Sequence, residues 1–290
     1  MIPKCYNAGR EVLHMKKDRR IAFNILTSLL SIMNQNDESN VDCVLAKYLL
    51  EHLDEIPRLS IYDLADACYV SRSSIHRFVR SCGYESFREF KKASVDADMH
   101  RRRFIQYTDF TDYPVHLKYQ TMQMMEDVTR IADSEEMSRT IEAIHDSKEV
   151  VFLVADDSSS PVRVFQQQMT AVNKIVRVLT SSNTNLSMID SLTDRDLLVV
   201  CSISGNFAIM INDDVRELAT KKILLTTNRT TLFSSSYDTI FYLSSYRFSA
   251  SSNLVASQNI YTAYSLSYFL DLLFHFYYEK YQFELKKDPR

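Results

Sequence analysis

Five short, nearly continuous apolar runs in the second half of the chain constrain its fold most. They are rich in Val, Ile and Leu, and segments of helical length and composition separate them. Strands that are buried on both faces have this pattern, and helical crossovers between them make the strands parallel. The runs are EVVFLVA (149–155), KIVRVL (174–179), DLLVVCS (196–202), KILLTT (222–227) and DTIFYL (238–243). They predict an α/β three-layer sandwich with a five-stranded parallel sheet.

The first third of the chain has a purely helical pattern. Its apolar residues recur three and four positions apart, as on one face of an amphipathic helix, and no strand pattern appears before residue 110. Helices are expected at residues 21–34, 41–53, 61–68, 72–82 and 86–98. A chain of 290 residues is long enough for two domains. The predicted units are an all-α domain at 1–103, a linker at 104–125, where the periodicity fails and Pro114 appears, and an α/β domain at 126–290.

One window of the helical part, LSIYDLADACYVSRSSIHRFVRSCGY (59–84), contains two short helices joined by a tight turn. Ser60 suits the N-cap of the first helix, and Gly83 suits the left-handed position after the second. The apolar stripe of the second helix consists of Ile75, Phe78 and Val79. The polar side chains left on its outside are Ser71, Arg72, Ser73, Ser74, His76, Arg77 and Arg80.

These outward side chains suit a DNA recognition helix. Such a helix presents polar and basic groups to base edges near its N-terminus, and arginine binds guanine through two hydrogen bonds. The net charge of the chain is -3, yet residues 72–103 contain 9 basic against 4 acidic residues. The alternative is a structural helix pair with a solvated basic face. Tyr69 stands where many such turns carry glycine, which costs about 1 kcal/mol if its φ is positive.

The predicted sheet places four hydroxyl-rich loops at its carboxyl edge, where α/β proteins bind ligands. In one of them Gly205 precedes a helix, so backbone N–H groups and the hydroxyls of Ser202 and Ser204 could hold a phosphate. Alternatively, Ser204 and Asn206 only cap that helix. The four loops are 155–161, 202–207, 226–231 and 244–252. The candidate ligand-binding residues are Ser158, Ser159, Ser202, Ser204, Gly205, Asn206 and Thr227.

Both halves resemble the RpiR/MurR family of bacterial transcription regulators, over about Val41 to the C-terminus. The matching helical residues are Ala65, Val70, Ser71, Ile75, Phe78, Gly83 and Phe87. In the second half, SISG (202–205) is similar to the family's phosphosugar loop, and VVFLVADDSS (150–159) aligns with its first strand and glycine-rich loop. The resemblance implies a helix-turn-helix domain followed by a domain of the sugar isomerase (SIS) fold, which senses a phosphosugar and dimerises.

The sequence departs from the family pattern in the ligand loops. Ala155 and Asp157 stand where the family has glycines, and Phe207 stands where it has a hydroxyl residue. Asp156 and Asp157 would repel a phosphate. One alternative is therefore a regulator whose SIS domain has lost its ligand and only dimerises.

The resemblance implies a DNA-binding regulator of carbohydrate metabolism genes, with no enzymatic activity. A phosphosugar isomerase is the less favoured alternative, because it needs a carboxylate or histidine as general base. Between Leu153 and Lys280, Glu217, Glu279 and His275 all fall inside predicted helices rather than strand-end loops. The five scattered cysteines form no zinc-ligand pattern, so no metal or cofactor is expected.

The remaining patterns concern compartment and partners. Unpaired cysteines, the lack of a signal-peptide pattern and the lack of a run of about 18 apolar residues predict a cytoplasmic protein without membrane contact. Segment 260–283 is apolar around most of a helix, which indicates buried core or core plus a subunit interface. The expected partners are a double-stranded DNA operator, a phosphosugar effector and further copies of the chain in a homodimer or homotetramer.

Overall fold

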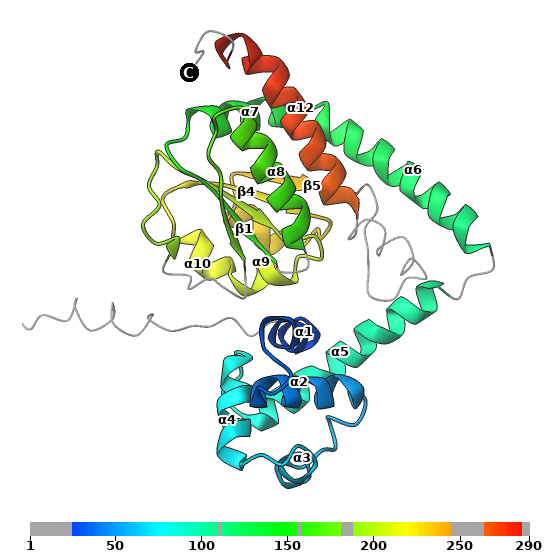
Figure 1. Ribbon diagram of the computed structural model, residues 1–290. Helices are drawn as coiled ribbons and strands as arrows, with labels where there is room; N and C mark the ends of the chain where they lie inside the picture. The colour runs from blue at the N-terminus through cyan, green and yellow to red at the C-terminus, as the bar shows by residue number, and fades with distance from the viewer. Residues whose placement is uncertain (1–24, 109–111, 156–157, 181–187, 245–263, 286–290) are drawn as a thin grey trace, which may run out of the picture.

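The computed structural model describes residues 25–108, 112–155, 158–180, 188–244 and 264–285. The chain forms an N-terminal helical unit and a C-terminal α/β unit (Figure 1). The helical unit contains α1 (Ile25–Gln35), α2 (Val41–Glu51), α3 (Ile61–Ala67), α4 (Arg72–Ser81) and α5 (Phe87–Thr108). The predicted succession of helices is confirmed, and α5 continues to Thr108 instead of ending near residue 98.

Capping residues set the starts and ends of these helices. The side-chain oxygens of Asn40, Ser60 and Ser71 each accept a hydrogen bond from a backbone N–H in the first turn of α2, α3 and α4. After α4, Gly83 has a φ of 89°, a left-handed conformation that favours glycine. The predicted roles of Ser60 and Gly83 are confirmed.

The helical unit has its own apolar core, into which α4 turns one face. Ile75, Phe78 and Val79 of α4 are buried, as the apolar stripe predicted. The ring of Phe78 meets the ring of Phe90 edge-on, with 6.4 Å between their centroids. Because α1 packs on α2 and α5, and α4 packs on α2 and α5, the core fixes the direction in which the opposite face of α4 points.

Segment 104–125, predicted as a linker, is largely helical. α5 extends to Thr108, and α6 (Tyr113–Ala132) begins with Pro114 in its first turn. Proline is tolerated there because its missing N–H would have no intrahelical partner. Pro114, expected from the sequence within a stretch without helical periodicity, therefore lies in the first turn of a helix, and the linker boundaries stay a prediction.

The α/β unit contains a sheet in which all five strands are parallel, in the order β2-β1-β3-β4-β5. The strands are β1 (Val150–Val154), β2 (Arg177–Thr180), β3 (Leu197–Cys201), β4 (Lys221–Thr226) and β5 (Thr239–Tyr242). Each overlaps one of the five apolar runs, to within one residue at the ends of β2 and β4. The predicted three-layer sandwich with a five-stranded parallel sheet is confirmed.

Alternate strand residues contribute to different cores on the two faces of the sheet. In β1, Phe152 and Val154 belong to one core, and Val151 and Leu153 belong to the other. The first core is covered by α6, α7 (Glu135–Asp146), α8 (Ser159–Ala171) and α12 (Leu266–Leu285). The second is covered by α9 (Asn206–Met210), α10 (Asn212–Arg216) and the 3-10 helix η4 (Thr231–Ser235).

Helix α12 buries part of its apolar surface within its own chain, while Tyr278 and Phe283 are exposed. It packs against α6, α7 and α8, and Figure 1 shows it beside α8 on one side of the sheet. Its buried side chains are Leu266, Phe269, Leu270, Leu273 and Tyr277. Of the two interpretations of segment 260–283, buried core accounts for these residues; residues 260–263 lie outside the described part. No helix in the described segments has both the length and the apolar character needed to cross a bilayer.

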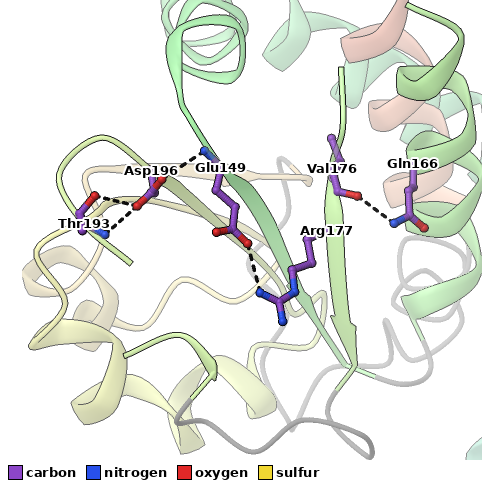
Figure 2. A network of polar contacts seen from close by, with 6 residues as sticks. All are labelled: Glu149, Gln166, Val176, Arg177, Thr193 and Asp196. Carbon is purple, nitrogen blue, oxygen red and sulfur yellow. Dashed lines mark hydrogen bonds and ion pairs between the residues drawn. The ribbon is translucent and has the colours of Figure 1, made fainter. Parts of the chain in front are cut away.

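At the amino edge of the sheet, the buried carboxylate of Asp196 links the segments that lead into β1 and β3 (Figure 2). Asp196 accepts hydrogen bonds from the Thr193 hydroxyl at 2.7 Å, the Thr193 backbone N–H at 2.8 Å and the Glu149 backbone N–H at 3.1 Å. These bonds, those from Thr193 above all, hold the pKa of Asp196 below its ordinary value. The Glu149 carboxylate in turn pairs with Arg177 at 3.1 Å across β1 and β2.

We expect Asp196→Asn to destabilise the α/β unit by about 1–2 kcal/mol at neutral pH. Because the folded pKa of Asp196 is lowered, its contribution is present above the unfolded pKa of about 3.9 and is lost as pH falls through the folded value. The difference in unfolding free energy between wild type and variant should therefore shrink on acidification below about pH 4. Urea titrations across pH measure it, with Asp194→Asn, an exposed carboxylate of the same turn, as control. A pH-independent difference would contradict the assignment.

Candidate nucleic-acid interface and strand-end loops

The two helices of the window 59–84 are α3 and α4, joined by the short turn at 68–71. Tyr69 in this turn has a φ of 54°, and its side chain is 96% exposed. Tyr69, which stands where many such turns carry glycine, thus has a positive φ, the condition under which a cost was expected. Its backbone redirects the chain so that the N–H of Val70 donates to the carbonyl of Ala65 at 3.0 Å, and α4 starts immediately afterwards.

The polar side chains of α4 point away from its core, as the apolar stripe required. Arg72, His76, Arg77 and Arg80 are exposed, and so are Ser71 and Ser73, whereas Ser74 is half-buried. The seven candidate DNA-binding residues therefore share the outer face and N-terminal end of one helix. This face carries three guanidinium groups within three turns, so it can supply donors to base edges and phosphates together.

Serines fix the N-terminal end of α4. The Ser71 hydroxyl accepts from the Ser74 backbone N–H at 3.2 Å and lies 2.7 Å from the Ser73 hydroxyl and 3.0 Å from the Ser74 hydroxyl. Ser71 thus caps the helix, while Ser73 keeps an exposed hydroxyl next to it. The first residue after the cap is Arg72, which places its guanidinium at the turn.

One contact between α3 and α4 was not predicted from the sequence. Arg72 donates from Nη1 to the hydroxyl of Tyr62 at 3.1 Å, and its guanidinium carbon lies 4.9 Å from the centre of the Tyr62 ring. The two residues are ten positions apart on different helices, so no periodicity indicates the contact. Only the angle between α3 and α4, set by the turn, brings them together.

In the α/β unit, the candidate ligand residues gather at the carboxyl ends of β1, β3 and β4, which are neighbours in the sheet. Ser158 and Ser159 follow β1 at the start of α8, with Ser158 buried and Ser159 half-buried. Asp156 and Asp157 lie outside the described residues, as does most of the fourth predicted loop, 244–252.

Two of the candidate hydroxyls bind the protein's own backbone. The Ser202 hydroxyl is buried and accepts from the Ala208 N–H at 3.1 Å, inside the first turns of α9. The Thr227 hydroxyl is also buried and donates to the Ile203 carbonyl at 2.8 Å. The Ser202 bond closes the loop after β3 onto α9, and the Thr227 bond holds the loop after β4 against the loop after β3. Both hydroxyls are therefore turned inward rather than toward the surface of the loops.

Asn228 closes over the glycine of the same loop. Gly205 has a φ of 80°, and a Cβ added to it would overlap the side chain of Asn228. The Asn228 amide donates to the Ser204 carbonyl at 3.0 Å, and its oxygen accepts from the Thr230 N–H at 3.0 Å. Asn206, by contrast, is exposed. The structure thus brings the predicted loop residues together and adds Asn228, whose role no sequence pattern indicated.

Comparison with known proteins gives a match for the helical unit. Residues 22–98 match the model of the helix-turn-helix domain of the rpiR family. An uncharacterized HTH-type transcriptional regulator of Caldanaerobacter subterraneus is 25% identical over 134 residues, which cover 44% of this chain and 48% of that protein. This match spans about half the length of that relative. The HTH-type transcriptional regulator GlvR of Bacillus subtilis is 24% identical over 201 residues, covering 67% of this chain and 70% of GlvR.

Two solved structures have a similar chain trace at low identity. The Vibrio vulnificus NanR protein complexed with ManNAc-6P is 18% identical, with 91% of this chain and 94% of that chain covered and a TM-score of 0.48. The sugar isomerase domain of the RpiR transcription factor from Sphaerobacter thermophilus is 13% identical, with 61% and 96% covered and a TM-score of 0.47. Residues 22–98 thus form a helix-turn-helix domain that matches the rpiR family.

Proposed function

We propose that the protein is a transcription regulator that binds double-stranded DNA through α4. The observation that carries this proposal is the outer face of α4, where Arg72, His76, Arg77 and Arg80 are exposed around a capped N-terminus. In helix-turn-helix proteins the second helix lies in the major groove and presents such residues to base edges. The regulators among its relatives support the same role. We propose a cytoplasmic location on the same ground, because a DNA-binding regulator acts in the compartment that holds its operator.

Selection from a library of random DNA duplexes tests this proposal. The full chain, immobilised at moderate salt, should enrich duplexes that share one sequence, and two copies of the chain would enrich a palindrome. A bound population without a shared sequence after repeated rounds would contradict the proposal.

We propose, second, that the α/β unit holds the protein in a homodimer or larger homo-oligomer. Helix α6 carries exposed apolar side chains along one face, at positions three and four apart. They are Val115, Tyr119, Met122 and Met125. Contiguous apolar surface of this kind is typical of subunit interfaces. A second copy of the chain would cover it, and the dimer would present two recognition helices to one palindromic operator.

We expect the full chain to be a dimer or larger at micromolar concentration, and the double variant Tyr119→Glu/Met122→Glu to be a monomer. Two carboxylates on the stripe would be desolvated without partners in the interface, which costs several kcal/mol. Light scattering measures the mass, and Val164→Glu on the exposed face of α8 is the matched control. A monomeric wild type, or a double variant that stays dimeric, contradicts this interface.

The loops after β1, β3 and β4 have two candidate roles. A phosphosugar effector is favoured by the hydroxyls of Ser158, Ser159 and Ser204 near the left-handed turn at Gly205. Dimerisation without an effector is favoured by the closed loop contacts of Ser202 and Asn228. Catalysis has no comparable support, because His275 and Glu279 lie exposed on α12, away from the strand ends. We propose a non-enzymatic sensor of carbohydrate derivatives, with the dimerisation-only role as the second candidate.

Thermal melting separates the two roles. If the loops bind a phosphosugar, a saturating hexose or amino-sugar phosphate stabilises the α/β unit by about 2.7 kcal/mol at a hundredfold excess over the dissociation constant. Ser204→Ala should then abolish the shift, and Asp157→Gly should enlarge it by removing a repelling charge. Inorganic phosphate and the unphosphorylated sugars are the controls. If neither wild type nor Asp157→Gly shifts with any of these phosphates, the domain acts in dimerisation alone.

A further inference from the structure

The contact between Tyr62 and Arg72 lies at the junction of the two helices that form the candidate DNA-binding motif. Tyr62 is in the first turn of α3, where Ser60 caps the helix, and Arg72 is the first residue of α4. The Tyr62 side chain is 61% exposed and Arg72 is exposed, so the pair lies on the surface of the motif rather than in its core. An aromatic ring this exposed contributes little to the apolar core behind it.

The geometry constrains Arg72 in two ways at once. The guanidinium carbon lies over the Tyr62 ring, 4.9 Å from its centre, and one N–H donates to the hydroxyl at 3.1 Å. The cation–π contact and the directional hydrogen bond together limit the orientations open to the guanidinium. An unrestrained arginine would lose much rotamer entropy when it binds a base, so restraint before binding favours the complex.

The restraint leaves most of the binding capacity of Arg72 unused. A guanidinium has five N–H donors, and the Tyr62 hydroxyl takes one of them. The remaining donors include a pair on one edge, which is the arrangement that binds O6 and N7 of guanine. Arg77 and Arg80, further along α4, have no such aromatic partner among the described ring contacts. Arg72 therefore differs from them in having two contacts that restrain its guanidinium.

We infer that Tyr62 is a positioning residue that holds Arg72 to read one guanine of the DNA site, so that the pair determines sequence specificity at that base. This inference rests on the proposed function, since it assigns the base reader within the same interface. Tyr62 need not contact the DNA itself. Tyr62 affects DNA binding by orienting the guanidinium of Arg72. Because its side chain is uncharged, it does not attract the DNA phosphates.

A double-mutant cycle on the full chain tests the inference. The probes are the duplex selected from the random library and a set of duplexes that replace each of its guanines in turn. The variants are Tyr62→Leu, Tyr62→Phe, Arg72→Ala and the double variant Tyr62→Leu/Arg72→Ala. Fluorescence anisotropy gives the affinity of each variant for each duplex, and thermal melting checks that the helical unit stays folded.

We expect Tyr62→Leu to weaken binding about three- to tenfold and to relax the preference at one guanine only, with an unchanged salt dependence. Tyr62→Phe, which keeps the ring but loses the hydroxyl, should retain part of that preference. In the Arg72→Ala background, Tyr62→Leu should have no further effect, because the residue acts through Arg72. Additive effects in the cycle, or preference loss at a base that Arg72→Ala leaves unaffected, overturn the inference. A wild type that binds no duplex would instead overturn the proposed function.

Discussion

Phe78→Ala is expected to unfold or nearly unfold the helical unit, with a loss of about 3–5 kcal/mol in its free energy of unfolding. The Phe78 ring is fully buried in α4 and meets Phe90 of α5, so its removal leaves a cavity between two helices. DNA binding should fall with the folded fraction, because α4 keeps its direction only while its apolar face is packed. Chemical denaturation followed by circular dichroism measures the loss.

The two units have separate cores, and that provides the control for this variant. The melting transition of the α/β unit should be unchanged in Phe78→Ala, whereas Phe152→Ala should lower that transition and leave the helical unit folded. Ile75→Val, a smaller deletion in the same helix, should cost about 0.5–1.5 kcal/mol. Equal losses in both units after Phe78→Ala would show that the cores are not independent.

The second large effect is expected from the arginines of α4. Arg72→Ala and Arg77→Ala should each weaken specific DNA binding by about 1–3 kcal/mol where the side chain contacts a base. Where a side chain contacts a phosphate instead, its removal should reduce the slope of log affinity against log salt by about 1. The double variant should therefore lose most of the specific affinity. Anisotropy titrations on the selected duplex, repeated across a salt series, separate the two kinds of contact.

Arg139→Ala provides the matched control for these charge changes. Arg139 is an exposed arginine of α7 in the α/β unit and pairs with Glu135. Its removal changes the net charge by the same amount as the removal of Arg72 or Arg77, but at a site outside the helical unit. It should leave both the affinity and the salt slope unchanged. If Arg72→Ala and Arg77→Ala also leave both unchanged while the fold is intact, α4 is not the DNA-binding helix.

Much of the fold follows from local sequence patterns. The five apolar runs locate the strands because a parallel sheet buries both faces, and Ser60 and Gly83 locate helix ends because capping depends on nearby residues alone. Pro114 was expected in a linker, but proline also occurs in the first turn of helices, where α6 has it. The sequence of α6 does not separate its buried face from its exposed one, because apolar residues occur on both. Met124, for example, is buried, whereas its neighbour Met125 is exposed.

The sites were less predictable than the fold. The stripe of Ile75 and Phe78 fixes which side chains of α4 point outward, so that part needs only helical periodicity. The Tyr62–Arg72 contact and the position of Asn228 over Gly205 depend instead on the angle between two elements, which the sequence does not encode locally. The hydroxyls of Ser202 and Thr227 suggested a ligand loop by residue type, yet residue type does not tell whether a hydroxyl binds a ligand or its own backbone.

The most direct test of sequence-specific DNA binding compares the wild-type chain on two duplexes of equal length. One is the sequence selected from the random library, and the other is the same composition scrambled. Fluorescence anisotropy across a salt series should show the selected duplex bound on the order of a thousandfold or more tightly than the scrambled one, with an affinity that falls steeply as salt rises. Equal affinity for the two duplexes at every salt concentration would contradict the account.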